Sequence, residues 1–278
     1  CGDEILKQFS RCMQSCINEN QKIYELGNGR FMIMDLVNHS KEDILELYDE
    51  LKKSVEVALE ENAYRIVYTI SVGIVEIDKE IQDYDTLIKY SEFALNEAKK
   101  KGKNSCYFFT HDKYRQFIRR REIRVELQNA VDHNFKNFDV YYQPIIDIHT
   151  RNLIGAEALM RFKMKRNEQI EFVSPAEFIP ILEESGLIIP AGRWILRQAV
   201  ACCKKWQEFI PKFKMNVNLS YVQIIKSGIL DEIKQALKDY NLKPALLGIE
   251  VTETGYLENT YHYKKLWSSL KEEGITLI

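Results

Sequence analysis

Two spacings of hydrophobic residues alternate along the first third of the chain. Apolar side chains recur every three to four positions in residues 3–18, 40–62 and 84–104, which predicts three helices. Residues 22–36 and 64–77 are rich in β-branched and aromatic residues and predict strands. Between two strand-like runs, "LGNG" predicts a hairpin turn, because Asn and Gly tolerate the positive φ of a tight turn. Residues 1–110 therefore predict an α/β domain.

A charged stretch at 111–134 repeats apolar residues about once per turn and predicts a helix that joins two halves. Beyond it, strand-like and helical runs alternate. Strands are predicted in 138–148, 152–162, 213–220, 246–254 and 274–278, and helices in 174–186, 192–209 and 228–240. This alternation favours βαβ units with a parallel sheet, and a barrel is the most economical architecture.

The length of the second half limits that barrel. Residues 121–278 supply four or five strands, whereas a closed eight-stranded β/α barrel takes about 250 residues. The chain ends in the strand-like "GITLI" and begins on a helix with no preceding strand. We therefore expect an incomplete barrel at the C-terminus, an incomplete α/β domain at the N-terminus, and a chain that is a piece of a longer protein.

Charge and targeting signals narrow the class of protein. Lys plus Arg (39) nearly balances Asp plus Glu (41), so nothing favours a nucleic acid polymer as partner. No uncharged apolar run approaches the ~20 residues that span a bilayer, and "CGDEILKQF" is no signal peptide. The six cysteines contain no CxxC pair, which is typical of reduced thiols. We expect a cytoplasmic chain, whose parent protein has room for sensory or membrane segments upstream.

The segment "GAEALMRF" (155–162) places an acid and a base together. In an extended strand Glu157, Leu159 and Arg161 share one face, because side chains alternate between the two faces. An ion pair or a solvated edge strand explains this octapeptide as well as a binding site does.

Oxygen-bearing side chains recur in two further predicted strands. Asn216 and Asn218 share one face of "KMNVNLS", and Glu250 lies in "LGIEVTET", followed by Glu253. Each has an ordinary structural explanation, such as a cap, a loop start or an ion pair. Barrel sites, however, collect residues from the C-terminal ends of several strands. Together these oxygens suit Mg²⁺ or Mn²⁺, and a nearby arginine suits a phosphate ester.

Four motifs in order identify a resemblance over residues 121–278. "YYQPIIDIHTRNLIGAEALMRF", "FVSPAEFIPILEESGLIIPAGRWIL", "VNLS" and "IEVTET" resemble the first half of the EAL domain of cyclic di-GMP phosphodiesterases, a TIM-like β/α barrel. The resemblance implies that Glu157, Asn218 and Glu250 bind the metal, and that Glu253 orders the loop beside it. It also implies that Leu159 packs against cyclic di-GMP and that Arg161 contacts its phosphate.

That family hydrolyses cyclic di-GMP to linear pGpG with metal-activated water and tends to form homodimers. Its paired aspartates, a lysine and a late general-base glutamate would all follow Ile278. The resemblance thus implies activity for a parent protein and makes activity of residues 121–278 alone doubtful.

Residues 1–110 resemble a GGDEF domain, the nucleotidyl cyclase fold with a ferredoxin-like core. Its signature turn reads Gly27-Asn28-Gly29-Arg30-Phe31, so both acids of the family motif are replaced. The family's product-inhibition pair would fall at Asn18 and Gln21 and is also missing. The resemblance implies an inactive regulatory or structural domain. Whether its turn binds GTP, and whether Arg30 contacts a phosphate or is simply solvated, stays open.

Three functions remain open at this stage. The first is a phosphodiesterase with an inactive GGDEF domain. The second is a non-catalytic cyclic di-GMP receptor. The metal ligands expected in the first half of the EAL domain are all retained, which disfavours this alternative. The third is an unrelated metal-dependent barrel.

Overall fold

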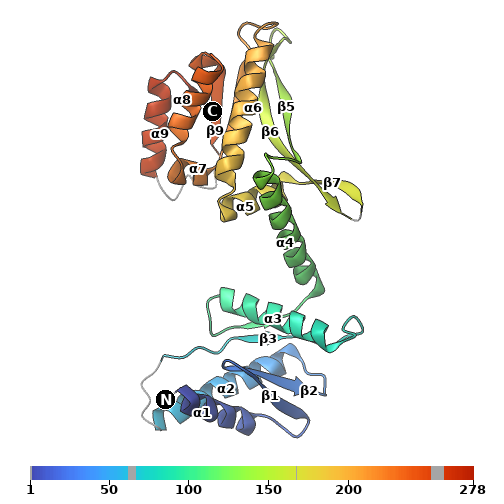
Figure 1. Ribbon diagram of the computed structural model, residues 1–278. Helices are drawn as coiled ribbons and strands as arrows, with labels where there is room; N and C mark the ends of the chain where they lie inside the picture. The colour runs from blue at the N-terminus through green and yellow to red at the C-terminus, as the bar shows by residue number, and fades with distance from the viewer. Residues whose placement is uncertain (1, 62–66, 167, 252–259) are drawn as a thin grey trace. The chain divides into compact units, whose positions relative to one another are not determined.

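The computed structural model describes residues 2–61, 67–166, 168–251 and 260–278 (Figure 1). The chain divides into two compact units, Cys1–Arg115 and Gln116–Ile278. In the described part of the chain, no helix has the length and apolar character that crossing a membrane requires.

The first unit contains helices and short strands in alternation. They are α1 (Gly2–Cys16), β1 (Gln21–Gly27), β2 (Arg30–Asp35), α2 (Lys41–Glu61), β3 (Val72–Ile74), α3 (Tyr84–Lys100) and β4 (Cys106–Phe108). β1 and β2 form an antiparallel hairpin, and β3 pairs with β4 in parallel. The predicted helices and hairpin are confirmed. The predicted β-rich run at 64–77 contributes only the three residues of β3, and residues 62–66 lie outside the described part.

The hairpin turn has the backbone that its sequence predicts. Gly27, Asn28 and Gly29 all have positive φ, at 78°, 54° and 68°. Glycine adopts this region without steric cost, and asparagine tolerates it better than most residues do. The sequence "GNG" therefore determines where β1 ends and β2 begins.

The second unit begins within α4 (His111–Asp132). It continues with β5 (Phe138–Ile146), β6 (Leu153–Arg166), β7 (Gln169–Val173), α5 (Pro175–Ser185), α6 (Ile188–Trp206), β8 (Lys214–Leu219), α7 (Tyr221–Lys226), α8 (Ile229–Asp239), a short 3₁₀ turn η1 (Pro244–Leu246), β9 (Leu247–Val251), α9 (Thr260–Glu272) and β10 (Thr276–Leu277).

These strands form one six-stranded sheet in the order β10-β9-β8-β6-β5, with β7 also paired to β6. β6, β8, β9 and β10 are mutually parallel, as a β/α barrel requires. The predicted parallel sheet is therefore present in these four strands, and it is extended by β5 and β7, which run antiparallel to β6. Their connections to β6 are short turns, whereas a parallel crossover needs a dozen or more residues. The result is a partial TIM-like barrel.

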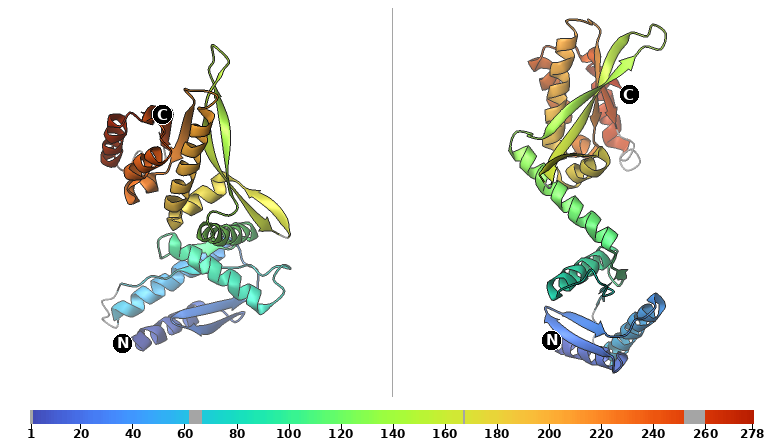
Figure 2. Two further views of the ribbon diagram at one scale, coloured as in Figure 1. Left: turned by 45° about the horizontal axis from the view of Figure 1, so that its top comes forward. Right: turned by 90° about the vertical axis from the view of Figure 1, so that its right-hand side faces the viewer.

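Helices cover one face of this sheet (Figures 1 and 2). α6 packs along β8, α8 packs beside α6, and α9 packs beside α8. The shared core contains buried residues from both strands and helices, among them Ala158, Val200, Met215, Ile233 and Leu270. The other face of the same strands is free of this core, and it carries the polar side chains of interest.

Candidate functional site

β6 separates its side chains onto two faces. Ala158, Met160 and Phe162 are buried against the helices, at 1%, 8% and 1% exposure. Glu157, Leu159 and Arg161 alternate with them and are partly exposed. The predicted sharing of one face by an acid, an apolar residue and a base is therefore a feature of the structure.

β8 separates its side chains in the same way. Met215, Val217 and Leu219 are buried at 0%, 3% and 4% exposure, so burial of this apolar set places Asn216 and Asn218 on the opposite face. A slip of one residue would exchange the two sets, and the hydrophobic core prevents it.

The strand register brings the predicted ligands together. Glu157 in β6 lies opposite Asn216 in β8, and Asn218 lies opposite Glu250 in β9. Nδ2 of Asn218 donates a hydrogen bond of 2.6 Å to Oε1 of Glu157, and Nδ2 of Asn216 donates one of 3.0 Å to Oε1 of Glu250. Three neighbouring strands thus present two carboxylates and two amides on one face. Glu253 lies outside the described residues.

This donor set suits a hard divalent cation. Carboxylate and amide oxygens are the ligands that such ions prefer, and rotation of the Asn218 amide would turn its oxygen toward Glu157. Within the described ranges, no group of three or more His, Cys, Asp or Glu side chains is placed to hold a metal ion. The described face therefore holds two carboxylates and two amides, whose oxygens are the ligands that a hard divalent cation would use.

Arg161 shares one face of β6 with Glu157 but is not paired with it. Its Nη1 donates to the backbone oxygen of Met160 at 2.9 Å, and its guanidinium carbon lies 5.4 Å from the centroid of the Tyr141 ring. The nearby Asp139 instead accepts from Nζ of Lys163 at 2.9 Å. Among the described residues no carboxylate forms an ion pair with Arg161. The simple Glu/Arg ion pair that the octapeptide also allowed is therefore not formed between Glu157 and Arg161.

Tyr141 was not predicted from the sequence, because its contact with Arg161 crosses between strands. Tyr141 pairs with Leu159 in the β5–β6 register, and Gln143 pairs with Glu157. The alternation within "YYQP" was the available signal, since it places Tyr141 and Gln143 on one face of β5.

The first unit shows little that would hold a metal at its signature turn. Arg30 forms an ion pair of 3.2 Å with Glu92, and both side chains are largely exposed. Gln21 donates to Asp35 through its side chain, which is a structural contact. The described turn therefore presents a cation where the GGDEF motif has acids.

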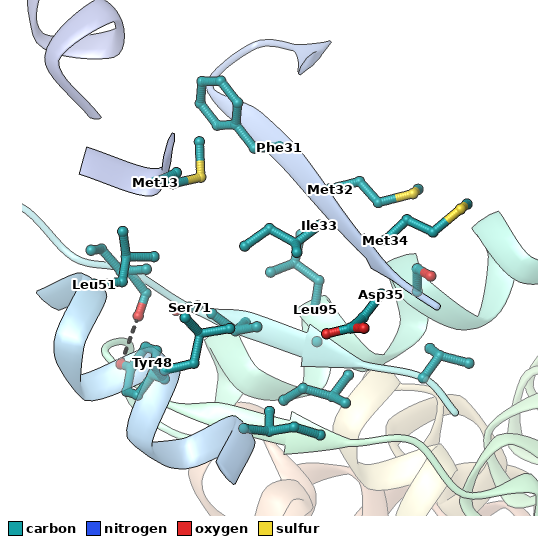
Figure 3. A pocket seen from close by; sticks show the side chains of 18 of the residues that line it. Met13, Phe31, Met32, Ile33, Met34, Asp35, Tyr48, Leu51, Ser71 and Leu95 are labelled. Atoms are coloured by element: carbon teal, nitrogen blue, oxygen red, sulfur yellow. Dashed lines mark hydrogen bonds between the residues drawn. The ribbon is translucent and has the colours of Figure 1, made fainter. Parts of the chain in front are cut away.

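A broad groove of about 1870 Å³ also lies within the first unit. Figure 3 shows apolar side chains, including Phe31, Ile33 and Leu51, around it, with Asp35 at one side. Asp35 is already bonded to Gln21 and to His39. The groove thus offers mainly apolar surface.

Two family models match the chain. Residues 124–278 match the EAL domain, and residues 1–105 match the diguanylate cyclase, GGDEF domain. The EAL match covers more than half of the chain and contains every ligand candidate described above.

The similarity to curated relatives extends over both matched domains. The signalling protein YkoW of Bacillus subtilis is 29% identical over 99% of this chain and 34% of its own length. The cyclic di-GMP phosphodiesterase PdeR of Escherichia coli is 27% identical over 93% of this chain and 38% of its own length. The chain therefore spans about a third of the length of these relatives.

Solved structures agree on the fold. The PaMucR phosphodiesterase in complex with c-di-GMP is 26% identical, with a TM-score of 0.51, and covers 56% of this chain and 62% of its own. The EAL enzyme Bd1971 in its cAMP-bound form is 19% identical, with a TM-score of 0.52, and covers 89% of this chain and 54% of its own. The chain belongs to the EAL family and carries a GGDEF-type domain ahead of its EAL domain.

Proposed function

We propose that the protein containing this chain is a metal-dependent phosphodiesterase that hydrolyses cyclic di-GMP to linear pGpG. The observation that carries the proposal is the contact of Asn218 with Glu157, made beside Glu250 in the neighbouring strand. Relatives named cyclic di-GMP phosphodiesterases, and the PaMucR complex with c-di-GMP, supply the substrate class.

Each residue has a distinct role in this proposal. Glu157, Asn218 and Glu250 hold the cation, and Arg161 binds a phosphate oxygen through its forked donors. Leu159 lies between Glu157 and Arg161 on the same face and packs against the substrate. Glu253 orders the adjoining loop.

EAL phosphodiesterases are generally dependent on divalent metals, and we propose Mg²⁺ or Mn²⁺ here. Such an ion, when bound, lowers the pKa of a coordinated water and offsets charge on the transition state. In the net reaction the water oxygen bonds to phosphorus, one ester bond breaks, and the leaving sugar oxygen takes a proton. Arg161 stabilises the negative phosphoryl oxygens during this exchange.

The test is hydrolysis of cyclic di-GMP by the full-length protein, followed by chromatography of the product. Glu157→Gln keeps the side-chain volume but removes the charge, so the rate should fall by about 100-fold or more, as expected for a disturbed metal site. Glu168→Gln is the matched control, because the Glu168 side chain is 89% exposed and pairs only with Lys165 among the described residues. It should leave the rate unchanged.

The same assay separates enzyme from receptor. Linear product from the wild type, lost in Glu157→Gln, supports the phosphodiesterase. Binding of cyclic di-GMP without any product contradicts it and favours a receptor. The 278-residue chain assayed alongside shows how much of the activity its own residues supply.

For the first unit we propose a regulatory domain without cyclase activity, which binds GTP through the backbone of its turn. The replacement of both motif acids by Asn28, Gly29 and Arg30 supports the lack of cyclase activity. Incubation with GTP and Mg²⁺ should yield no cyclic di-GMP, and equilibrium dialysis tests GTP binding.

We also propose homodimerisation through the EAL domain, which sedimentation of the full-length protein tests.

A further inference from the structure

Asn216 holds the carboxylate of Glu250 from the neighbouring strand. Its Nδ2 donates 3.0 Å to Oε1 of Glu250, and both side chains are only partly exposed. Asn216 lies two residues before Asn218 on the same face of β8. A hydrogen bond to one carboxylate oxygen restricts the side-chain rotamer and leaves the other oxygen for a further ligand.

The space that Asn216 occupies exists because residue 248 is a glycine. A Cβ built on Gly248 would lie 2.4 Å from Oδ1 and 3.2 Å from Cγ of Asn216. Gly248 is the register partner of Asn216, so the amide lies directly over its backbone. Its φ is not in the left-handed region, so the backbone itself does not require a glycine there. The requirement comes from the neighbouring amide.

We propose that Asn216 and Gly248 form a positioning pair that orients Glu250 for the metal, an inference that rests on the proposed function of the site. Gly248 leaves room for the amide, and the amide orients the carboxylate. Both are positioning residues, because neither contacts the substrate or the reacting atoms. Loss of either should weaken the metal affinity, in the range of about 10- to 100-fold known for groups that orient metal ligands.

Mn²⁺ provides the direct probe, through its affinity and the electron paramagnetic resonance spectrum of the full-length protein. Asn216→Ala removes the donor and should weaken Mn²⁺ binding about 10-fold. Asn216→Leu keeps the bulk without the donor and should weaken it equally, which separates the hydrogen bond from packing. Gly248→Ala should displace the amide and give a similar loss.

The double variant Asn216→Ala/Gly248→Ala decides whether the two residues act together. If Gly248 serves only to admit Asn216, the double variant binds Mn²⁺ no more weakly than Asn216→Ala alone. The added Cβ would also lie 2.7 Å from Cδ1 of Ile278, a flexible side-chain end. A loss of Mn²⁺ affinity that Gly248→Ala causes through Ile278 would persist in the double variant. If the losses of the two single variants add up in the double variant, the proposed pairing of Asn216 with Gly248 is overturned.

Two controls match the two changes. Asn152→Ala removes an exposed asparagine just before β6, and Gly228→Ala adds a Cβ whose nearest atom is 3.8 Å away. Both should retain wild-type Mn²⁺ affinity. Unchanged affinity in Asn216→Ala and Asn216→Leu would overturn the positioning role while the proposed function stands. A wild type that neither binds Mn²⁺ nor hydrolyses cyclic di-GMP would overturn both together.

Discussion

The guanidinium of Arg161 lies over the ring of Tyr141, with 5.4 Å between the guanidinium carbon and the ring centroid. The two residues come from antiparallel strands, β6 and β5. Stacking on an aromatic face holds the planar guanidinium in place while leaving its N–H donors available at the edge. Arg161 is therefore oriented by contacts within the chain itself.

Arg161→Lys should weaken substrate binding although the charge is kept. A lysine cannot present two parallel donors to a phosphate and stacks less well on Tyr141. We expect KM for cyclic di-GMP to rise about 10-fold, equivalent to about 1.4 kcal/mol, with a smaller change in kcat. Arg124→Lys, at an exposed position of α4, is the control and should behave as wild type. An unchanged KM in Arg161→Lys would exclude a forked contact with the phosphate.

The sequence predicted the faces of the strands and the parallel direction of β6, β8, β9 and β10, but not the antiparallel direction of β5 and β7. Period-two alternation in residues 153–164 identified Glu157, Leu159 and Arg161 as one group, because the buried set beside them is strictly apolar. The antiparallel β7 was missed, since "KMKRNEQIEF" contains charged residues that are typical of a solvated loop. Three of those charges have tertiary partners, and the bond of Glu171 to Arg119 is the clearest case.

Arg119 in α4 connects that helix to β7 and α5. Its Nη2 and Nη1 donate to the two oxygens of Glu171 at 2.6 and 3.0 Å, and its Nε donates to Glu177 at 3.3 Å. The Arg119 side chain is only 17% exposed, so these bonds are partly shielded from water. A bidentate, shielded pair is stronger than an open one.

Arg119→Ala should therefore destabilise the second unit by about 1–2 kcal/mol, because it leaves Glu171 without its partner. Arg120→Ala is a neighbouring control. Arg120 pairs with Glu184 through side chains that are 47% and 68% exposed, so its loss should cost less than about 1 kcal/mol. Urea unfolding followed by tryptophan fluorescence measures both, because Trp194, Trp206 and Trp267 all lie in the second unit. Equal losses would contradict the shielding argument.

The candidate ligands were predicted from a pattern that recurs in successive strands. The hydrogen bond that holds Glu250 was not predicted from the sequence. Recurrence of oxygen-bearing residues in successive strands indicated Glu157, Asn216, Asn218, Glu250 and Glu253 as a group, and the family resemblance then selected three of them as metal ligands. The link from Asn216 to Glu250 depends on which residues lie opposite each other across β8 and β9. Register of this kind comes from packing of the whole sheet, and no local pattern reveals it.

Ser220 follows β8 directly and is the buried N-cap residue of α7. Its Oγ donates to Oε1 of Glu183 at 2.6 Å and accepts from the backbone N–H of Val222, and Gln223 completes the capping box. Ser220→Ala should cost about 1–2 kcal/mol in the urea assay, because the cap is lost and Glu183 loses a donor. Ser174→Ala removes an N-cap of α5 that is exposed and should cost about half as much. A smaller loss at Ser220 than at Ser174 would contradict this account.

The thiol of Cys203 should make the second unit less stable in alkali. Burial raises the pKa of this thiol to about 11, from an ordinary value of 9.0. Below pH 9 the thiol is neutral in both the folded and the unfolded chain. Between about pH 9 and pH 11 only the unfolded chain loses the proton, so unfolding is favoured as the pH rises through this window.

The expected loss is on the order of 2 kcal/mol at the upper end of that window, since each pKa unit corresponds to about 1.4 kcal/mol. Other groups titrate there too, so the informative quantity is the difference between variants. Cys203→Ala should show a flatter decline of the unfolding free energy between pH 8 and pH 10.5 than the wild type. Parallel curves for the wild type and Cys203→Ala would show that the Cys203 thiol ionises in the folded protein as readily as in the unfolded chain.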